Sequence, residues 1–161
     1  MSTGAPLPIK NAQEIEKLKG EKQFFEWTPT LSCLTESEAL TVEYTRQTGY
    51  GCKIKINDSI SIVFVECFIR GSITAVSSGN NYATIKGLPY KNSLSNSCPS
   101  FNFNNFYKGI DTSHSIPTGF INNKIIRVQD STNTARGAAV EKWVTCTNFE
   151  ITGSGFYFTN E

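Results

Sequence analysis

The longest apolar stretch of the chain runs from Ser59 to Arg70 and is rich in β-branched and aromatic residues. Alternate positions are apolar in both registers, with Phe64 and Phe68 in one and Val65 and Ile69 in the other. A strand that is apolar on both faces is expected inside a sheet covered on both sides. The stretch is too short for a membrane-spanning helix, and its β-branched content disfavours a core helix. It therefore predicts the central strand of a two-layer β protein.

Strand-sized segments recur at short intervals through the rest of the chain. Leu40–Thr45 alternates, the segment Gln47–Gly49 is expected to turn the chain, and Lys53–Ile56 alternates again before the central strand. The pairs Asn57-Asp58 and Asn122-Asn123 are typical of tight hairpin turns. No long amphipathic helix interrupts this series. The pattern predicts an all-β fold, an antiparallel β-sandwich or jelly-roll-like knob.

The first residues follow a different pattern. Residues 1–10 are small and polar and are expected to form a disordered lead-in. Asn11 and Glu14 fit a capping box ahead of Ile15 and Leu18, which predicts a short helix in a stalk segment over residues 11–26. So short a helix is unstable alone, and it either packs on its own domain or pairs with copies of itself at the end of a stalk. The head domain is expected over residues 27–161.

Charge and cysteine content narrow the function classes. The chain has 15 basic and 14 acidic residues, and they are scattered, so nucleic acid is not an expected partner. The amino terminus shows no secretory signal, and membrane insertion is not expected. The five cysteines form no CxxC or CxxH pair, so no metal site is predicted, and buried free thiols are favoured over a disulfide framework.

Catalytic chemistry is not expected. His114 is the single histidine and lies in the polar loop Asp111–Ser115, where neighbouring acid, hydroxyl and imidazole groups do not make an oriented triad. Glu66 shares a strand face with Phe64 and Phe68 and is expected to be a paired structural acid. No phosphate-binding loop or other cofactor motif occurs. The sequence thus predicts no catalytic residues and no cofactor.

Carbohydrate binding is the function that these residue types support, because aromatic rings stack on sugar C–H faces while amides and carboxylates bond hydroxyls. The densest source is the segment 90–114. Phe101 and Phe103 alternate within it and are expected in the core, as is Trp143. Residues near the loops are better candidates for binding a ligand. The predicted ligand-binding residues are Tyr90, Tyr107, Asp111 and His114.

Several short motifs follow one another along the chain: W-T-P-T-L at 27–31, Q-T-G-Y-G-C-K-I at 47–54, the strand 60–69, I-K-G-L-P at 85–89 and S-G-F-Y at 154–157. Taken in this order, they resemble the carboxy-terminal domain of bacteriophage and prophage tail-fibre or receptor-binding proteins. The resemblance covers roughly residues 27–159. The chain departs from the family pattern in two ways: Lys55–Asp58 replaces a G-N turn in the hairpin, and five cysteines are unusual for the family.

The resemblance implies a β-sandwich knob at a fibre tip, usually a homotrimer, that binds a host cell-surface glycan or protein and is attached to other tail or baseplate proteins. Such a protein is made in the bacterial cytoplasm, is part of the virion, and reaches the outside on lysis, which suits reduced cysteines. Two alternatives stay open. One is a fragment of a glycan depolymerase, and the other is a purely structural baseplate or collar component.

Overall fold

The computed structural model describes residues 22–34, 39–77, 82–93, 100–110, 117–129 and 142–161. Within these ranges the fold is all-β, without a helix, which confirms the predicted class. All strand pairs are antiparallel, and the strand order is β1-β3-β4-β9-β6-β7-β8-β5-β2. The strands are β1 (Lys22–Trp27), β2 (Thr30–Cys33), β3 (Leu40–Lys55), β4 (Ser61–Val76), β5 (Ala83–Lys86), β6 (Ser100–Tyr107), β7 (Thr118–Asn122), β8 (Ile125–Gln129) and β9 (Cys146–Thr159).

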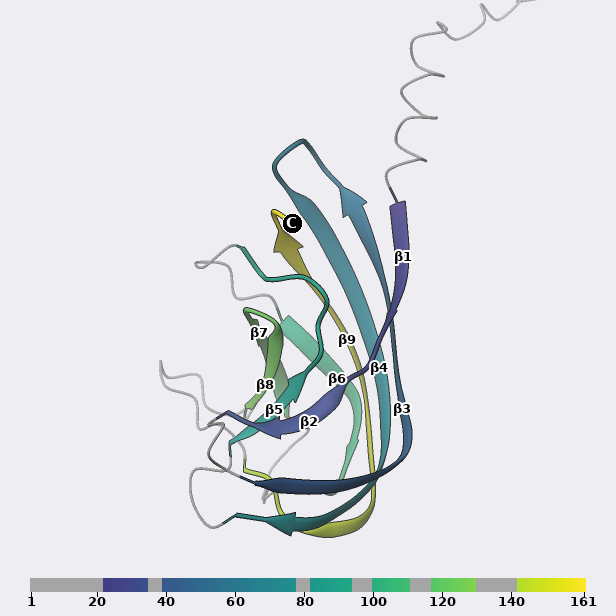
Figure 1. The fold of residues 1–161 in the computed structure, drawn as a ribbon, viewed down its shortest axis with the longest axis vertical. Helices are drawn as coiled ribbons and strands as arrows, with labels where there is room; N and C mark the ends of the chain where they lie inside the picture. Colours follow the sequence, from purple (N-terminus) through teal and green to yellow (C-terminus); the bar gives the residue numbers. More distant parts are fainter. Residues whose placement is uncertain (1–21, 35–38, 78–81, 94–99, 111–116, 130–141) are drawn as a thin grey trace, which may run out of the picture.

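The sheet is curled. Figure 1 shows the long strands β3, β4 and β9 with the short strands β2, β5, β7 and β8 gathered on one side of them. The strands β1 and β2 lie at opposite ends of the strand order, yet only Thr28 and Pro29 separate them in the chain. The Leu31 N–H of β2 donates to the Tyr44 hydroxyl of β3 at 2.8 Å. The chain therefore ties the two ends of the curled sheet together around one core.

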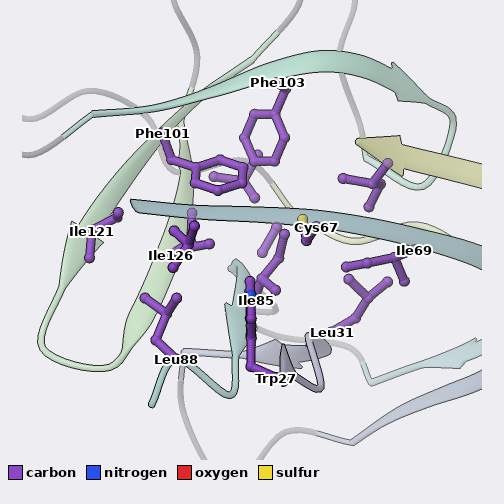
Figure 2. Close-up of a cluster of buried hydrophobic side chains, with 14 of the residues drawn as sticks. Trp27, Leu31, Cys67, Ile69, Ile85, Leu88, Phe101, Phe103, Ile121 and Ile126 are labelled. Atoms are coloured by element: carbon purple, nitrogen blue, oxygen red, sulfur yellow. The ribbon is translucent and has the colours of Figure 1, made fainter. Parts of the chain in front are cut away.

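The core fills the inside of the curl, and Figure 2 shows part of it. Ile69, Phe101 and Ile126 are fully buried there. Phe101 and Phe103 lie edge to face with ring centroids 5.2 Å apart, and both are buried, as predicted. Trp143 is also buried, and its indole N–H donates to the Ser32 carbonyl at 2.8 Å. The predicted core assignment of these three aromatic residues is confirmed.

The long strands bend at one level. Register shifts occur between Tyr44 and Arg46 on β3 and between Gly71 and Ile73 on the β4–β9 pair. Such irregularities increase local twist and bend a strand. A Cβ at Gly71 would collide with the Glu43 carbonyl oxygen, so the close approach requires glycine. In Figure 1 the ends of β3 and β4 beyond this level curve beneath the short strands.

Both predicted hairpins are confirmed. In the first, between β3 and β4, the Asn57 side-chain oxygen accepts hydrogen bonds from the N–H groups of Ser59 and Ile60, each at 2.9 Å. The turn extends over Ile56–Ile60, because the Ile56 N–H donates to the Ile60 carbonyl. In the second, between β7 and β8, Asn123 has φ 58°. Asparagine tolerates this left-handed conformation better than most residues.

The predicted turn at Gln47–Gly49 is wrong, because β3 runs through it without interruption. Gly49 pairs with Trp27 on β1 and with Cys67 on β4. A Cβ at Gly49 would collide with the Trp27 ring, which lies over it. The glycine therefore makes room for an aromatic ring inside the curl and does not mark a turn.

The expectation that β4 is covered on both sides is also wrong for the described residues. Val63, Val65, Cys67 and Ile69 face the core, whereas Phe64, at the alternate positions, is 43% exposed. The second apolar set of β4 continues onto Phe156 of β9. Apolar residues on both faces here mark a core on one side and an uncovered aromatic surface on the other.

The predicted short N-terminal helix is not supported. Residues 22–26, which the stalk segment 11–26 included, are β-strand: Lys22 pairs with Ile54, and Phe25 pairs with Gly51. Phe25 points inward and contacts Tyr90, whose ring lies edge-on with the centroids 5.4 Å apart. This burial of an aromatic ring favours a strand over a continued helix. The capping-box segment Asn11–Lys19 and the lead-in lie outside the described residues.

Burial makes the Cys67 thiol inert, and thiol labelling tests this. Burial raises the pKa of Cys67 to about 12 from an ordinary value of 9.0. Between these two pH values the thiol of the folded protein stays protonated, whereas the thiol of the unfolded chain ionises. This contribution to stability is complete below about pH 9 and is lost as the pH rises towards 12. At about pH 8.5 we expect iodoacetamide to label half-buried Cys52 and to spare Cys67.

Mass spectrometry of peptides from the labelled protein measures both cysteines in one sample. Labelling in urea serves as the control, because unfolding exposes both thiols. Equal rates at Cys52 and Cys67 in the folded protein would contradict the assignment of Cys67 to the inside of the curl.

Candidate functional site

The surface with functional potential is the side of β1, β3, β4, β9 and β6 that points away from the core, here called the outer face. It arises because alternate residues of each strand point to opposite sides. On β4 the outward positions carry Phe64, Glu66, Phe68 and Arg70, all at least partly exposed. Neighbouring strands lie about 4.7–4.9 Å apart, so outward residues in register form rows across the sheet.

Exposed aromatic rings surround an open groove of about 470 Å³ on the outer face, here called the aromatic groove. Phe24 is 79% exposed, Tyr50 47%, Phe64 43% and Phe156 41%. The rings of Phe64 and Phe156 lie 6.2 Å apart at 42°. A contiguous group of exposed apolar side chains marks a binding region, whereas single exposed apolar residues are ordinary.

The groove combines an aromatic row with a polar row. Register places Phe24 opposite Cys52, Cys52 opposite Phe64, and Phe64 opposite Phe156. The polar row crosses the same strands two residues further along β4, at Glu66 instead of Phe64. Its members in register are Glu26, Tyr50, Glu66, Ser154 and Asn102. An amphipathic ligand that lay between the two rows would contact ring faces on one side and hydrogen-bonding groups on the other.

A second, polar cavity of about 440 Å³ opens on the same face and is here called the Tyr107 cleft. It is lined by Arg70, Asn105, Tyr107, Asn148 and Glu150. The Asn105 amide donates to one Glu150 oxygen at 2.9 Å, and the Arg70 Nε lies 3.7 Å from the other. Half of the Tyr107 side chain is exposed. The cleft therefore offers a ring face, amides and a guanidinium to a ligand.

The cleft belongs to a third row of outward residues. Register places Arg46 opposite Arg70, Arg70 opposite Glu150, and Glu150 opposite Tyr107. The row lies four residues along β4 from the polar row, which is about 13 Å at roughly 3.3 Å per residue. The aromatic groove and the Tyr107 cleft are thus two parts of one surface.

The structure separates the predicted ligand-binding residues. Tyr107 lies in the cleft named after it. Tyr90 lies on the core side, with its ring against Phe25 and with the Lys53 ammonium 4.4 Å from its centroid. Asp111 and His114 lie outside the described residues. Of the described pair, only Tyr107 faces the surface that carries the two cavities.

Sequence reasoning missed the aromatic groove. Phe24, Tyr50, Phe64 and Phe156 were not among the predicted ligand-binding residues. The signal was present in β4, where Glu66 shares its alternation with Phe64 and Phe68, because a carboxylate on an apolar face indicates that the face is open to solvent. Glu66 lines the groove and forms no ion pair with any described residue. A Lys or Arg partner of Glu66 on an adjacent strand is therefore not seen there, and a partner from another subunit stays a prediction.

The part of the chain that the structure describes contains neither a cluster of metal-ligating side chains nor a membrane-spanning helix. No three His, Cys, Asp or Glu side chains gather there as metal ligands would. Nor do those residues include a helix of the length and apolarity needed to cross a bilayer. Cys52, Cys67 and Cys146 are free thiols.

Comparison with known proteins returned no match from protein-family models, curated proteins or solved structures. Any statement of function for this chain therefore depends on its own residues and geometry.

Proposed function

We propose that the chain is the receptor-binding tip domain of a bacteriophage or prophage tail fibre, which binds a polysaccharide of the bacterial surface. The observation that carries this proposal is the outer face, where an aromatic row lies beside a polar row. Sugars have apolar C–H faces and hydroxyl rims, and the pairing of the two rows suits both. The motif resemblance over residues 27–159 supports the same function.

The proposal includes the rest of the assembly. The curled sheet is a β-sandwich knob in this interpretation, three copies form the tip, and further tail or baseplate proteins hold it on the virion. The domain binds and does not cut in this proposal. Glycoside hydrolysis uses two carboxylates that face each other across a cleft, and among the described residues each of these two cavities is lined by one, Glu66 in the aromatic groove and Glu150 in the Tyr107 cleft. Multivalent attachment through three copies would raise avidity for a repeating polymer well beyond the affinity of one copy.

Binding of surface polysaccharide by the purified chain tests the proposal. We expect the chain to bind one or a few members of a panel of bacterial polysaccharides and to block phage adsorption to the corresponding host. Tyr50→Ala should lower the affinity at least about tenfold, which is the effect of removing a central aromatic anchor. Ile56→Ala is the matched control, because Ile56 is 54% exposed on the distant hairpin turn.

Three results would count against the proposal. The chain could bind no polysaccharide in the panel, Tyr50→Ala could bind as the unaltered chain does, or new reducing ends could appear on incubation with the bound polymer. The last would favour a depolymerase fragment.

A structural role in a baseplate or collar is the second candidate, and the exposure of Phe24 favours it. A phenylalanine that is 79% exposed beside two further rings is typical of a contact between proteins. Light scattering separates the two functions when combined with the binding assay. A chain that assembles through Phe24, so that Phe24→Ser dissociates it, yet binds no polysaccharide would be a structural component.

A further inference from the structure

We infer that the Tyr107 cleft binds an anionic unit of the polysaccharide, one that carries a carboxylate or a phosphate. This inference rests on the proposed function and adds the chemical class of the ligand. It depends on the arrangement of charge around the cleft, which differs from that of the aromatic groove.

Two arginines lie opposite each other on neighbouring strands of the outer face, Arg46 on β3 and Arg70 on β4. Like charges directly opposite each other destabilise a sheet. The Arg46 guanidinium is held over the Phe68 ring, with Cζ 4.2 Å from the centroid. An anion bound beside Arg70 would offset the like charge of Arg46 on the neighbouring strand, and guanidinium is the side-chain group best suited to carboxylate and phosphate.

Arg70 retains capacity for a ligand. Its ion pair with Glu150 runs through Nε at 3.7 Å, and its side chain is 58% exposed. This contact uses one of the five N–H donors of a guanidinium group. Glu150 accepts a hydrogen bond from Asn105 on its other oxygen, so both of its oxygens are engaged within the cleft wall. The carboxylate therefore holds Arg70 and Asn105 in one wall of the cleft.

A third cation lies beside the Tyr107 ring. The Lys108 ammonium is 5.1 Å from the centroid of the Tyr107 ring, and Lys108 has φ 61°. Register places Tyr107 across Glu150 from Arg70, so a cation lies beside each of the outer two strands, β4 and β6, whose residues line the cavity of about 440 Å³. Among the described residues, the carboxylate that lines the cleft is Glu150, so Arg70 and the neighbouring Arg46 and Lys108 give this part of the outer face an excess of positive charge.

The Tyr107 ring and the Asn148 amide complete a site for a sugar that carries a charge. A half-exposed tyrosine offers a face for stacking, and an amide donates to and accepts from hydroxyls. A free inorganic anion would use the arginines and leave the ring and the amide without a role. The composition of the cleft therefore favours an anionic sugar unit over a simple ion.

Isothermal titration of the full chain with three probes of matched length tests this inference. The probes are an oligogalacturonate, a glycerol-phosphate oligomer and an uncharged galacto-oligosaccharide. We expect one of the two anionic probes to bind, which identifies the anion as carboxylate or phosphate, and we expect its affinity to fall as salt is raised. Arg70→Gln should weaken that binding roughly tenfold or more and leave binding of the neutral probe unchanged.

Lys91→Gln removes the same charge outside the cleft and serves as the matched control, with no expected effect. Lys108→Gln is a second test at an exposed position, and thermal unfolding shows whether each variant is folded. Equal binding of neutral and anionic probes, or an anionic affinity that Arg70→Gln and Lys108→Gln leave intact, would overturn the inference. If these results overturned the inference while the chain bound a bacterial polysaccharide, the proposed function would stand. If it bound none, that function would fail as well.

Discussion

Replacing Phe101 with alanine is expected to lower the free energy of unfolding by about 3–5 kcal/mol, because the ring is fully buried and the surrounding residues cannot close the cavity. Phe101 lies edge to face against Phe103. Its ring also occupies the space over Gly153, where a Cβ would collide with it. The loss would therefore affect the contact between β6 and β9 at the centre of the sheet.

Phe64→Ala is the matched control, since it makes the same chemical change on the outer face. Phe64 is 43% exposed, and its truncation is expected to cost less than about 1 kcal/mol. Chemical denaturation of both variants at low protein concentration, followed by tryptophan fluorescence, measures the difference. Equal losses for the two variants would show that the outer face is as buried as the core and would remove the basis for the aromatic groove.

Replacing Trp143 with alanine is expected to cost about 3–5 kcal/mol as well. The indole is 1% exposed, stacks on Phe106 with centroids 6.3 Å apart, and donates to the Ser32 carbonyl. It thus fixes the segment ahead of β9 onto β2. The variant should lose this link and unfold at a lower temperature in calorimetry.

Trp143→Phe separates packing from hydrogen bonding at this position. The Ser32 carbonyl also accepts from the Thr84 hydroxyl at 2.8 Å, so removal of the indole N–H leaves no buried acceptor without a donor. We expect a loss of about 2 kcal/mol, of which about 1 kcal/mol is the net value of one hydrogen bond and the rest comes from the smaller ring, which leaves part of the buried site unfilled. A loss as large as that of Trp143→Ala would contradict the view that ring packing dominates.

The fold class could be predicted from the sequence because alternation and turn residues act locally. Asn57 holds its turn through its side chain, Asn123 adopts a left-handed conformation that asparagine tolerates, and both hairpins follow. Gly49 could not be interpreted in the same way. Its position after Gln47 and Thr48 predicts a turn, whereas in the fold it makes room for the ring of Trp27, which is 22 residues away in the chain. A glycine that accommodates a distant side chain carries no local signal.

The candidate site could be predicted only in part, for a related reason. Tyr107 was found because it lies where alternation ends and a loop begins. The aromatic groove was not found, because it is built by register between strands: Phe24, Phe64 and Phe156 become neighbours only when β1, β3, β4 and β9 are aligned. Periodicity shows that a residue points to one side of a strand, and the choice between core and solvent depends on which side the sheet curls towards.

Since successive residues of β4 and β9 point to opposite sides, the positions that hold the fold and those that meet a ligand interleave along the same strands. Val63, Val65 and Cys67 can stay constant while Phe64 and Glu66 change. If the proposed receptor binding is correct, its specificity can therefore diversify through point substitutions at alternate positions, without loop insertions and without loss of the core.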